Sequence, residues 1–223
     1  MKIDIIMHVP HEGPGLLETI AAHFQDQLIY HRLYEEPNAI QKIDPKQVTF
    51  LIVMGGPMSA NDDLPWLPLE RQLIKAVYQN GGRVLGICLG AQQVALAFNG
   101  RVAPMRYKEL GWFPVASTVE DLPSGLVFHW HGEKIELPDI AQQIYTNDHC
   151  PAQGFRIGDR VYGLQFHPEM TQTGLDQLLA ADAAYLDEPS ETVQSLAQMQ
   201  KFDWRTSTGQ RITEMIYEAI RNS

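Results

Sequence analysis

Apolar and polar residues follow a strand–helix rhythm through the first hundred positions. Short apolar runs at 2–9, 27–33, 48–54 and 83–87 predict strands, and the unbroken run VTFLIVM at 48–54 is typical of a strand buried on both faces. Between these runs, apolar residues at helical spacing predict helices that begin near 16, 66 and 89. The last two end at Asn80-Gly81-Gly82 and Asn99-Gly100. The alternation predicts a parallel sheet with helices on both faces.

The second half of the chain has a different pattern. Strand-like runs at 112–119, 125–130, 143–146 and 154–166 are joined by turns without a long helix, which predicts antiparallel additions to the same sheet. From 171 onward the pattern is helical again. Because no linker or repeat interrupts the chain, we expect one domain over 1–223, with a helical C-terminal extension at about 187–223. That extension could cover a sheet edge, close over a site or form a homodimer contact.

Composition and charge exclude several classes of protein. The net charge of −10, without a basic cluster, argues against nucleic-acid binding. No apolar run approaches the roughly 18 residues of a membrane span. The start MKIDIIMHVP contains Asp4 and lacks a cleavage site, so we interpret it as the first strand, not a signal peptide. Two cysteines are too few for a disulfide framework, which favours a reducing cytoplasm.

The most informative short stretch is GICLG at 86–90. It places Cys88 between a buried strand and a helix, in the pattern of a nucleophile elbow. Glycines at 86 and 90 fit this geometry because a side chain at either position would clash in the sharp turn. The helix N-terminus favours the thiolate, which is the reactive form of cysteine. The alternative is a small residue packed at a strand end, and we assign that structural role to Cys150, which has no such setting.

A nucleophile needs a base, and YGLQFHPE at 162–169 offers one. His167 follows a predicted strand, and Glu169 lies two positions further on. Because residues i and i+2 of an extended chain face the same way, Glu169 can accept a hydrogen bond from one ring nitrogen while the other faces the thiol. The alternative is a solvated histidine–glutamate pair in a loop.

Attack on a carbonyl also requires donors for the oxygen that becomes negative. The GGP sequence at 55–57 follows the buried strand, so the N–H of Gly56 can turn into the site, and the N–H of Leu89 follows the nucleophile. Each such donor contributes roughly 3 kcal/mol to transition-state stabilisation. Without Cys88, an ordinary turn at the end of a strand would be the simpler interpretation of GGP.

Together the three motifs resemble the class I glutamine amidotransferase family. GGP, G-x-C-x-G-x-Q and F-H-P-E occur in that family's chain order, and the resemblance extends over roughly 1–186. FHWHGE at 128–133 and YKELGW at 107–112 also resemble stand-alone members similar to the amidotransferase domain of GMP synthase. The resemblance implies a flavodoxin-like three-layer sandwich with a mostly parallel central sheet and antiparallel edge additions.

The resemblance also implies roles for individual residues. Cys88 would attack the side-chain amide of glutamine, His167 would transfer the proton, and Glu169 would orient His167. A γ-glutamyl thioester would form and be hydrolysed, with Gly56 and Leu89 as the oxyanion hole. Substrate-binding groups are expected at five positions: Met58, Gln92, Trp130, His131 and Gly132.

The HWHG stretch at 129–132 departs from relatives that place serine or asparagine before the His-Gly pair. The side chains of Trp130 and His131 would then shape the pocket differently, or simply belong to a strand with packed and surface positions. We predict no metal and no cofactor, because no convincing ligand cluster or nucleotide-binding loop accompanies the motifs.

Three functions remain open at this stage. The first is a glutamine-hydrolysing amidotransferase that releases ammonia for a separate synthetase subunit. The second is a free-standing hydrolase of γ-glutamyl amides or peptides, with a different leaving amine. The third is a non-catalytic regulatory protein of the same fold, against which the presence of Cys88, His167 and Glu169 argues.

Overall fold

A computed structural model describes all 223 residues and contains one nine-stranded sheet, in the order β2-β1-β3-β4-β9-β8-β7-β5-β6. Five neighbouring strands of this sheet are parallel to one another: β1 (Lys2–Met7), β2 (Gln27–Arg32), β3 (Phe50–Val53), β4 (Arg83–Ile87) and β9 (Val161–Leu164). Their carboxyl ends therefore meet at one edge of the sheet, which is where ligands bind in open α/β folds. The predicted α/β fold is confirmed, but the sheet is mixed, because four strand pairs are parallel and four are antiparallel.

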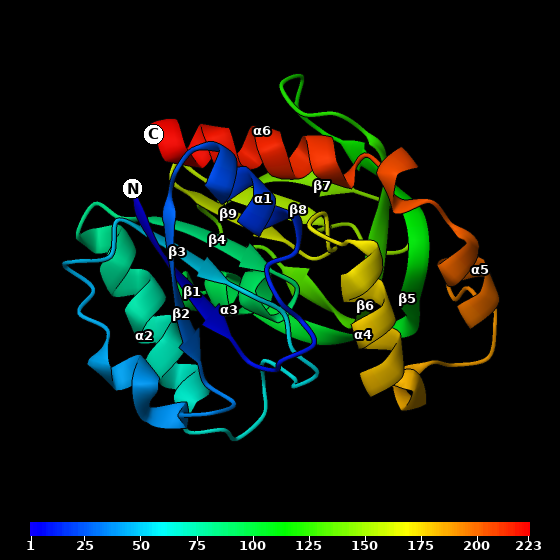
Figure 1. Cartoon of the computed structure of the whole chain (residues 1–223), viewed down its shortest axis with the longest axis horizontal. Coiled ribbons are helices and arrows are strands. Elements are labelled where there is room, and N and C mark those ends of the chain that lie inside the picture. The colour runs from blue at the N-terminus through cyan, green and yellow to red at the C-terminus, as the bar shows by residue number, and fades with distance from the viewer.

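Helices cover both faces of the parallel half (Figure 1). On one face α2 (Trp66–Gln79) and α3 (Leu89–Ala97) pack against alternate strand residues such as Leu51 and Val53. On the other, α1 (Leu16–His23) and α6 (Gly209–Asn222) cover the intervening residues, such as Phe50 and Ile52. Because successive side chains of a strand point to opposite faces, a strand buried on both sides reads as an unbroken apolar run, as 48–54 does.

The antiparallel half is more extensive than the sequence pattern indicates. β5 runs over Arg101–Ser117 and pairs with β6 (Gly125–Glu136), although the apolar pattern predicts strands only at 112–119 and 125–130. β7 (Gln142–Thr146) and β8 (Gly154–Ile157) complete it. The predicted run at 154–166 is two strands, since a turn at 158–160 separates β8 from β9 and only β9 joins the parallel set. The first part of β5 is not recognisable as a strand from the sequence, because both of its faces are partly solvated there and it lacks an apolar pattern.

The C-terminal third covers the β5–β6 ribbon before returning to the main sheet. α4 (Gln172–Ala181) and α5 (Leu196–Lys201) pack on the face of this ribbon that carries Trp112 and Phe128. Between them lie the short turn η2 (Ala183–Tyr185) and an extended stretch in which Val193 bridges to Leu110, so the region from 187 to 195 is not helical. η1 (Pro37–Lys42) and η3 (Trp204–Thr206) are the remaining short turns. None of the helices has the length and apolar character needed to cross a membrane.

Candidate active site

Cys88 occupies a strained turn between β4 and α3. Its φ of 51° and ψ of −111° lie in a region that side-chain-bearing residues rarely adopt, and its N–H donates to the carbonyl of Leu164 on β9 at 2.8 Å. A Cβ on Gly86 would lie 2.4 Å from the carbonyl oxygen of Gly90, and one on Gly90 would lie 2.0 Å from that of Val53. Both glycines are therefore required by close backbone approach, as the sequence predicts.

Gly90→Ala is expected to destabilise the protein by about 3 kcal/mol, because its Cβ must displace the backbone of β3 or α3. Urea unfolding of the variant and the wild type measures this difference. Gly81→Ala is the control for replacing a glycine: nothing lies within 4 Å of a Cβ at Gly81, so only its positive φ of 86° opposes that change. Equal stability of Gly90→Ala and the wild type would contradict the crowding argument.

His167 is brought to the same edge by β9 and β6. It follows the end of β9, and its backbone N–H donates to the carbonyl of Phe128 at 2.8 Å. Its Nδ1 lies 2.8 Å from Glu169 Oε1, so the carboxylate fixes the orientation of the ring. Its Nε2 is buried and has no protein hydrogen-bond partner of ordinary geometry. The charge of Cys88 also raises the pKa of His167, so the two side chains lie near one another.

Burial and charge act against each other in this pair. Burial by itself lowers the pKa of His167, but the carboxylate of Glu169 and the sulfur of Cys88 raise it well above the ordinary value. Burial raises the pKa of Cys88, and the nearby His167 and the N–H of Leu89 only partly offset this effect. The helix N-terminus therefore does not make Cys88 a free thiolate, contrary to the sequence-based expectation. We therefore expect deprotonation of the thiol to depend on His167.

The glycine loop after β3 is anchored from beneath by His8. His8 Nδ1 lies 2.9 Å from the carbonyl oxygen of Gly55, its Nε2 lies 2.9 Å from Glu70 Oε1, and its ring stacks on Trp66 at 5.0 Å. Burial lowers the pKa of His8, but Glu70 more than offsets this and raises it overall. These contacts hold the peptide planes of the loop, and Gly56 lines the cavity beside Cys88.

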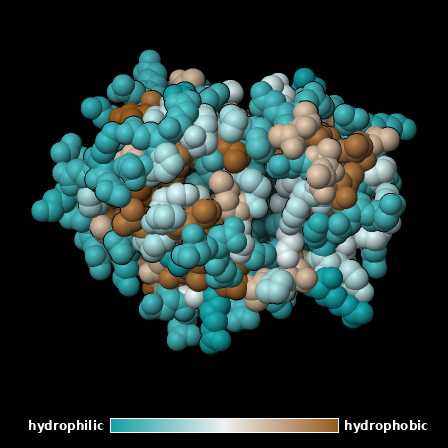
Figure 2. All heavy atoms as spheres, turned by 90° about the horizontal axis from the view of Figure 1, so that it is seen from below, coloured by the Kyte–Doolittle hydropathy of each residue, from teal (hydrophilic) through white to brown (hydrophobic).

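A cavity of about 480 Å³ opens over the thiol, a size that suits a small-molecule substrate. Figure 2 shows a hollow near the middle of the face that is seen from below, the side toward which β1 points in Figure 1. The lining includes Cys88 and every residue that the sequence analysis assigns to the oxyanion hole or to substrate binding: Gly56, Met58, Leu89, Gln92, Trp130, His131 and Gly132. His167 and Glu169 line an adjoining hollow, and Glu12 lines both.

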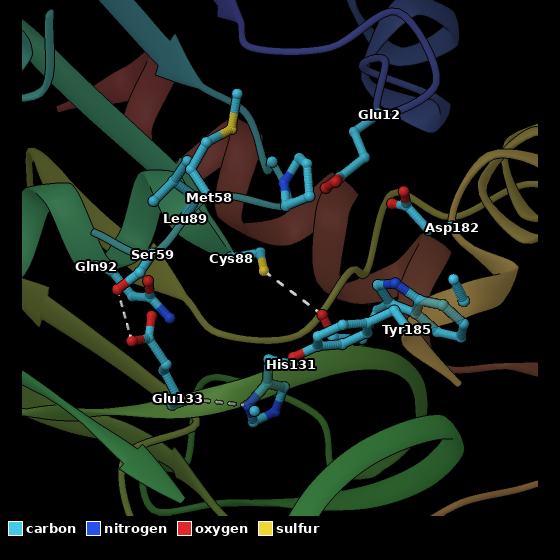
Figure 3. Close-up of a pocket in the computed structure, with 15 residues that line it drawn as sticks. Glu12, Met58, Ser59, Cys88, Leu89, Gln92, His131, Glu133, Asp182 and Tyr185 are labelled. Atoms are coloured by element: carbon cyan, nitrogen blue, oxygen red, sulfur yellow. Dashed lines mark hydrogen bonds between the residues drawn. The ribbon is translucent and has the colours of Figure 1, made fainter. Parts of the chain in front are cut away.

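The stretch at 130–132 contacts the cavity mainly through its backbone. Cys88 Sγ lies 3.9 Å from the carbonyl oxygen of Trp130, as the dashed line in Figure 3 shows. The indole of Trp130 packs against Phe128 and Tyr185 on the outer face of the ribbon. The ring of His131 donates through Nδ1 to the carbonyl of Glu133 at 3.0 Å. Neither side chain is therefore free to hold a substrate directly.

Behind the cavity, His131 also contacts a buried carboxylate. His131 Nε2 lies 3.2 Å from Glu109 Oε2, and the side-chain amides of Asn147 and Gln153 each donate to Glu109 at 2.6 Å. Burial raises the pKa of Glu109, but its hydrogen bond with His131 and the charges of His129 and His131 outweigh this and hold it at about 2. This network locks β5 to β6 and fixes the cavity wall.

Two groups of side chains bring together atoms that could hold a metal, with the ligand atoms of each group within 4.8 Å of one another. They are Glu109 with His129 and His131, and Glu12 with His11 and Asp182. The carboxylate of Glu109 already accepts two amide hydrogen bonds, and His11 Nε2 lies 3.2 Å from Asp182 Oδ2. We therefore keep the sequence-based proposal of no resident metal.

Several residues of the site escape the sequence analysis, among them three on one side of Cys88. Glu12, from the loop after β1, and Asp182 and Tyr185, from the turns after α4, line the cavity on one side of Cys88 (Figure 3). The sequence HEGPG at 11–15 carries one usable signal, because a charged residue at the carboxyl end of the first parallel strand falls at the ligand-binding edge. Asp182 and Tyr185 give no local signal, since only the path of α4 brings them there.

The comparisons of this chain with known proteins all point to the same family. The family model described as Glutamine amidotransferase class-I matches residues 16–185. A glutamine amidotransferase-like protein, YfeJ, from Salmonella typhimurium is 26% identical over 223 residues, covering 92% of each chain. A GMP synthase from Mannheimia succiniciproducens is 32% identical over 177 residues, covering 72% of this chain. The match covers only 33% of that GMP synthase, so this chain corresponds to about a third of its length.

The solved structures agree with the sequence comparisons. A crystal structure of a glutamine amidotransferase from Methylobacillus flagellatus superposes with a TM-score of 0.90 at 27% identity, covering 99% of this chain and 94% of that one. A glutamine amidotransferase from Thermotoga maritima superposes with a TM-score of 0.87 at 24% identity, covering 100% and 99% of the two chains. The second likeness, at its lower identity, bears on the fold alone.

Proposed function

This chain belongs to the class I glutamine amidotransferase family, and from that premise we propose that it hydrolyses the side-chain amide of glutamine through a γ-glutamyl thioester on Cys88. The observation that carries the proposal is the meeting of Cys88, His167 and Glu169 at one sheet edge, under a cavity of suitable size. His167 and Glu169 are close in sequence, but Cys88 lies on a distant segment, and it reaches them because β4 and β9 are neighbouring parallel strands.

The reaction begins when Cys88 Sγ attacks the amide carbon and its proton passes to His167 Nε2. The N–H groups of Gly56 and Leu89 stabilise the oxygen that becomes negative. His167 then gives the proton to the leaving nitrogen, the C–N bond breaks, and the amine departs from the thioester. A water molecule, deprotonated by His167, attacks the thioester carbon, and glutamate and the free thiol are released. Glu169 keeps the ring of His167 in place throughout and stabilises its positive charge.

The ammonia released goes, in this proposal, to a separate acceptor enzyme. The GMP synthases that match are about three times as long as the matched region, which supports an acceptor activity located outside the amidotransferase region. The residues that bind glutamine are the predicted set around Met58 and Gln92, with the backbone at 130–132. The two buried free cysteines suit a reducing compartment, and we propose the cytoplasm.

Glutamate release from glutamine tests this function directly. The purified chain is expected to release glutamate and to acquire one covalent adduct from 6-diazo-5-oxo-norleucine, located on Cys88 by peptide mass spectrometry. Cys88→Ser is the control and should show neither reaction. Because an amidotransferase without its partner can turn over slowly, the adduct decides the chemistry when turnover is weak. Absence of both adduct and turnover would favour the non-catalytic alternative, and efficient cleavage of γ-glutamyl peptides in place of glutamine would favour the hydrolase.

A further inference from the structure

The carboxylate of Glu12 is buried beside the reacting thiol without any partner. Its residue is 8% exposed, yet only burial and longer-range charges act on it, and no hydrogen bond or ion pair reaches it. The other three buried glutamates all have partners: Glu70 has His8 and Gln93, Glu109 has His131, Asn147 and Gln153, and Glu169 has His167. Because Glu12 lines the cavity and has no protein partner, its carboxylate is free to accept a hydrogen bond from a bound molecule.

The position of Glu12 identifies which part of a substrate it meets. A Cβ on Gly55 would lie 2.1 Å from Glu12 Oε2 and 3.0 Å from His167 Cε1, so these two atoms are at most 5.1 Å apart. Because Gly55 has no side chain, the carboxylate of Glu12 can occupy the space where a Cβ would otherwise lie. Glu12 and Cys88 also line the same cavity, so the carboxylate lies near both reacting side chains. In Figure 3, Glu12 and Asp182 lie on one side of Cys88, and Gln92, Ser59 and Glu133 lie on the other.

We propose that Glu12 and Asp182 form a subsite for the leaving amine, which selects neutral or positively charged amines over anionic ones. The inference rests on the proposed function, in which His167 gives its proton to the leaving nitrogen. That nitrogen must lie beside the imidazole, and thus on the side of the cavity where Glu12 lies. Glu12 accepts a hydrogen bond from its N–H, and the amine then leaves past Asp182.

The charges at this side of the cavity define the substrate class. A carboxylate oxygen of Asp182 lies within 4.8 Å of a carboxylate oxygen of Glu12, so a leaving group approaches two acidic side chains. His11 forms a hydrogen bond with Asp182 but not with Glu12. Glutamine itself releases ammonia, which fits this subsite. A γ-glutamyl derivative of a diamine adds a favourable positive charge, whereas a γ-glutamyl amino acid brings a carboxylate toward two others. The subsite therefore argues against γ-glutamyl peptides as the substrates of this enzyme.

Three substrates of nearly equal size test the charge preference: γ-glutamyl-1,2-diaminoethane, γ-glutamylethylamide and γ-glutamylglycine, whose leaving groups end in a positive, neutral and negative group. For the wild type, kcat/KM is expected to fall in that order, by roughly tenfold or more from the first to the last. Glu12→Gln keeps the shape of the side chain and should reduce this ratio to within about threefold, and Asp182→Asn should reduce it in the same direction. Glu133→Gln removes a carboxylate from the opposite side of Cys88 and should leave the ratio unchanged.

Labelling by 6-diazo-5-oxo-norleucine tests the proposed function independently of the subsite for the leaving amine, because that reagent has no amine leaving group. Glu12→Gln should be labelled on Cys88 at least as fast as the wild type. A wild type that neither labels nor turns over any substrate overturns the proposed function. A labelled, active wild type that prefers γ-glutamylglycine, or whose charge preference survives Glu12→Gln, overturns the subsite. If Glu12→Gln does not fold, the same comparison with Asp182→Asn decides.

Discussion

Cys88→Ala is expected to lower kcat for glutamine hydrolysis by about 10⁴-fold or more, because no other nucleophile lies in the cavity at that position. Cys88→Ser should be nearly as inactive, since a hydroxyl is a far weaker nucleophile than a thiol in a site built around sulfur. Glutamate release under saturating glutamine measures both. The expected loss is in kcat because the thiol reacts with the substrate after binding, whereas the variant leaves untouched the groups around Met58 and Gln92 that we propose hold glutamine.

The same position allows a control that separates catalysis from folding. Cys88 has a positive φ of 51°, which glycine adopts more easily than alanine. Cys88→Gly should therefore be about 1 kcal/mol more stable than Cys88→Ala in urea unfolding, while both are inactive. Retention of near-full activity in either variant would show that the covalent mechanism is wrong. A lower stability of the glycine variant would show that the turn is not strained.

The parallel half of the fold is readable from the sequence because local and global requirements coincide there. Strand β3 is buried on both faces, so its apolar run reports its position directly, and Gly86 and Gly90 are fixed by backbone contacts that the motif encodes. The long strand β5 is not readable in this way. Its first residues pair with β6 while exposing both faces to solvent, and its polar sequence therefore looks like a loop.

The residues of the site also differ in whether the sequence predicts them. Cys88, His167, Glu169 and Gly56 stand in short motifs that the sequence shows locally, and the pairing of neighbouring parallel strands brings the ends of these motifs together. Glu12 and Asp182 stand 170 positions apart, and their proximity depends on how α4 packs over the β5–β6 ribbon. The pKa of Cys88 was also beyond sequence reasoning, because burial outweighs the helix N-terminus and only the coordinates show the extent of burial.

Because Cys88 is not activated by the helix alone, the protonation of His167 should control the reaction, and Glu169 should control His167. Burial lowers the pKa of His167, and the carboxylate of Glu169 is the strongest influence that raises it. His167 must be neutral to accept the thiol proton, so kcat/KM of the wild type should rise with pH through an acid limb that lies above the ordinary histidine value of about 6.5.

Glu169→Gln should therefore have two effects with different causes. It removes the charge that raises the pKa of His167 while burial remains, so the acid limb of kcat/KM should move to lower pH. It also removes the partner that orients the ring and stabilises its positive charge, so the plateau should fall by about 10²–10⁴-fold. Profiles of kcat/KM between about pH 5 and 10 measure both effects, with the exposed Glu218→Gln as the matched charge control. An acid limb that stays in place, or moves to higher pH, would show that Glu169 does not set the charge of His167, and His167 would then need another partner to act as the base.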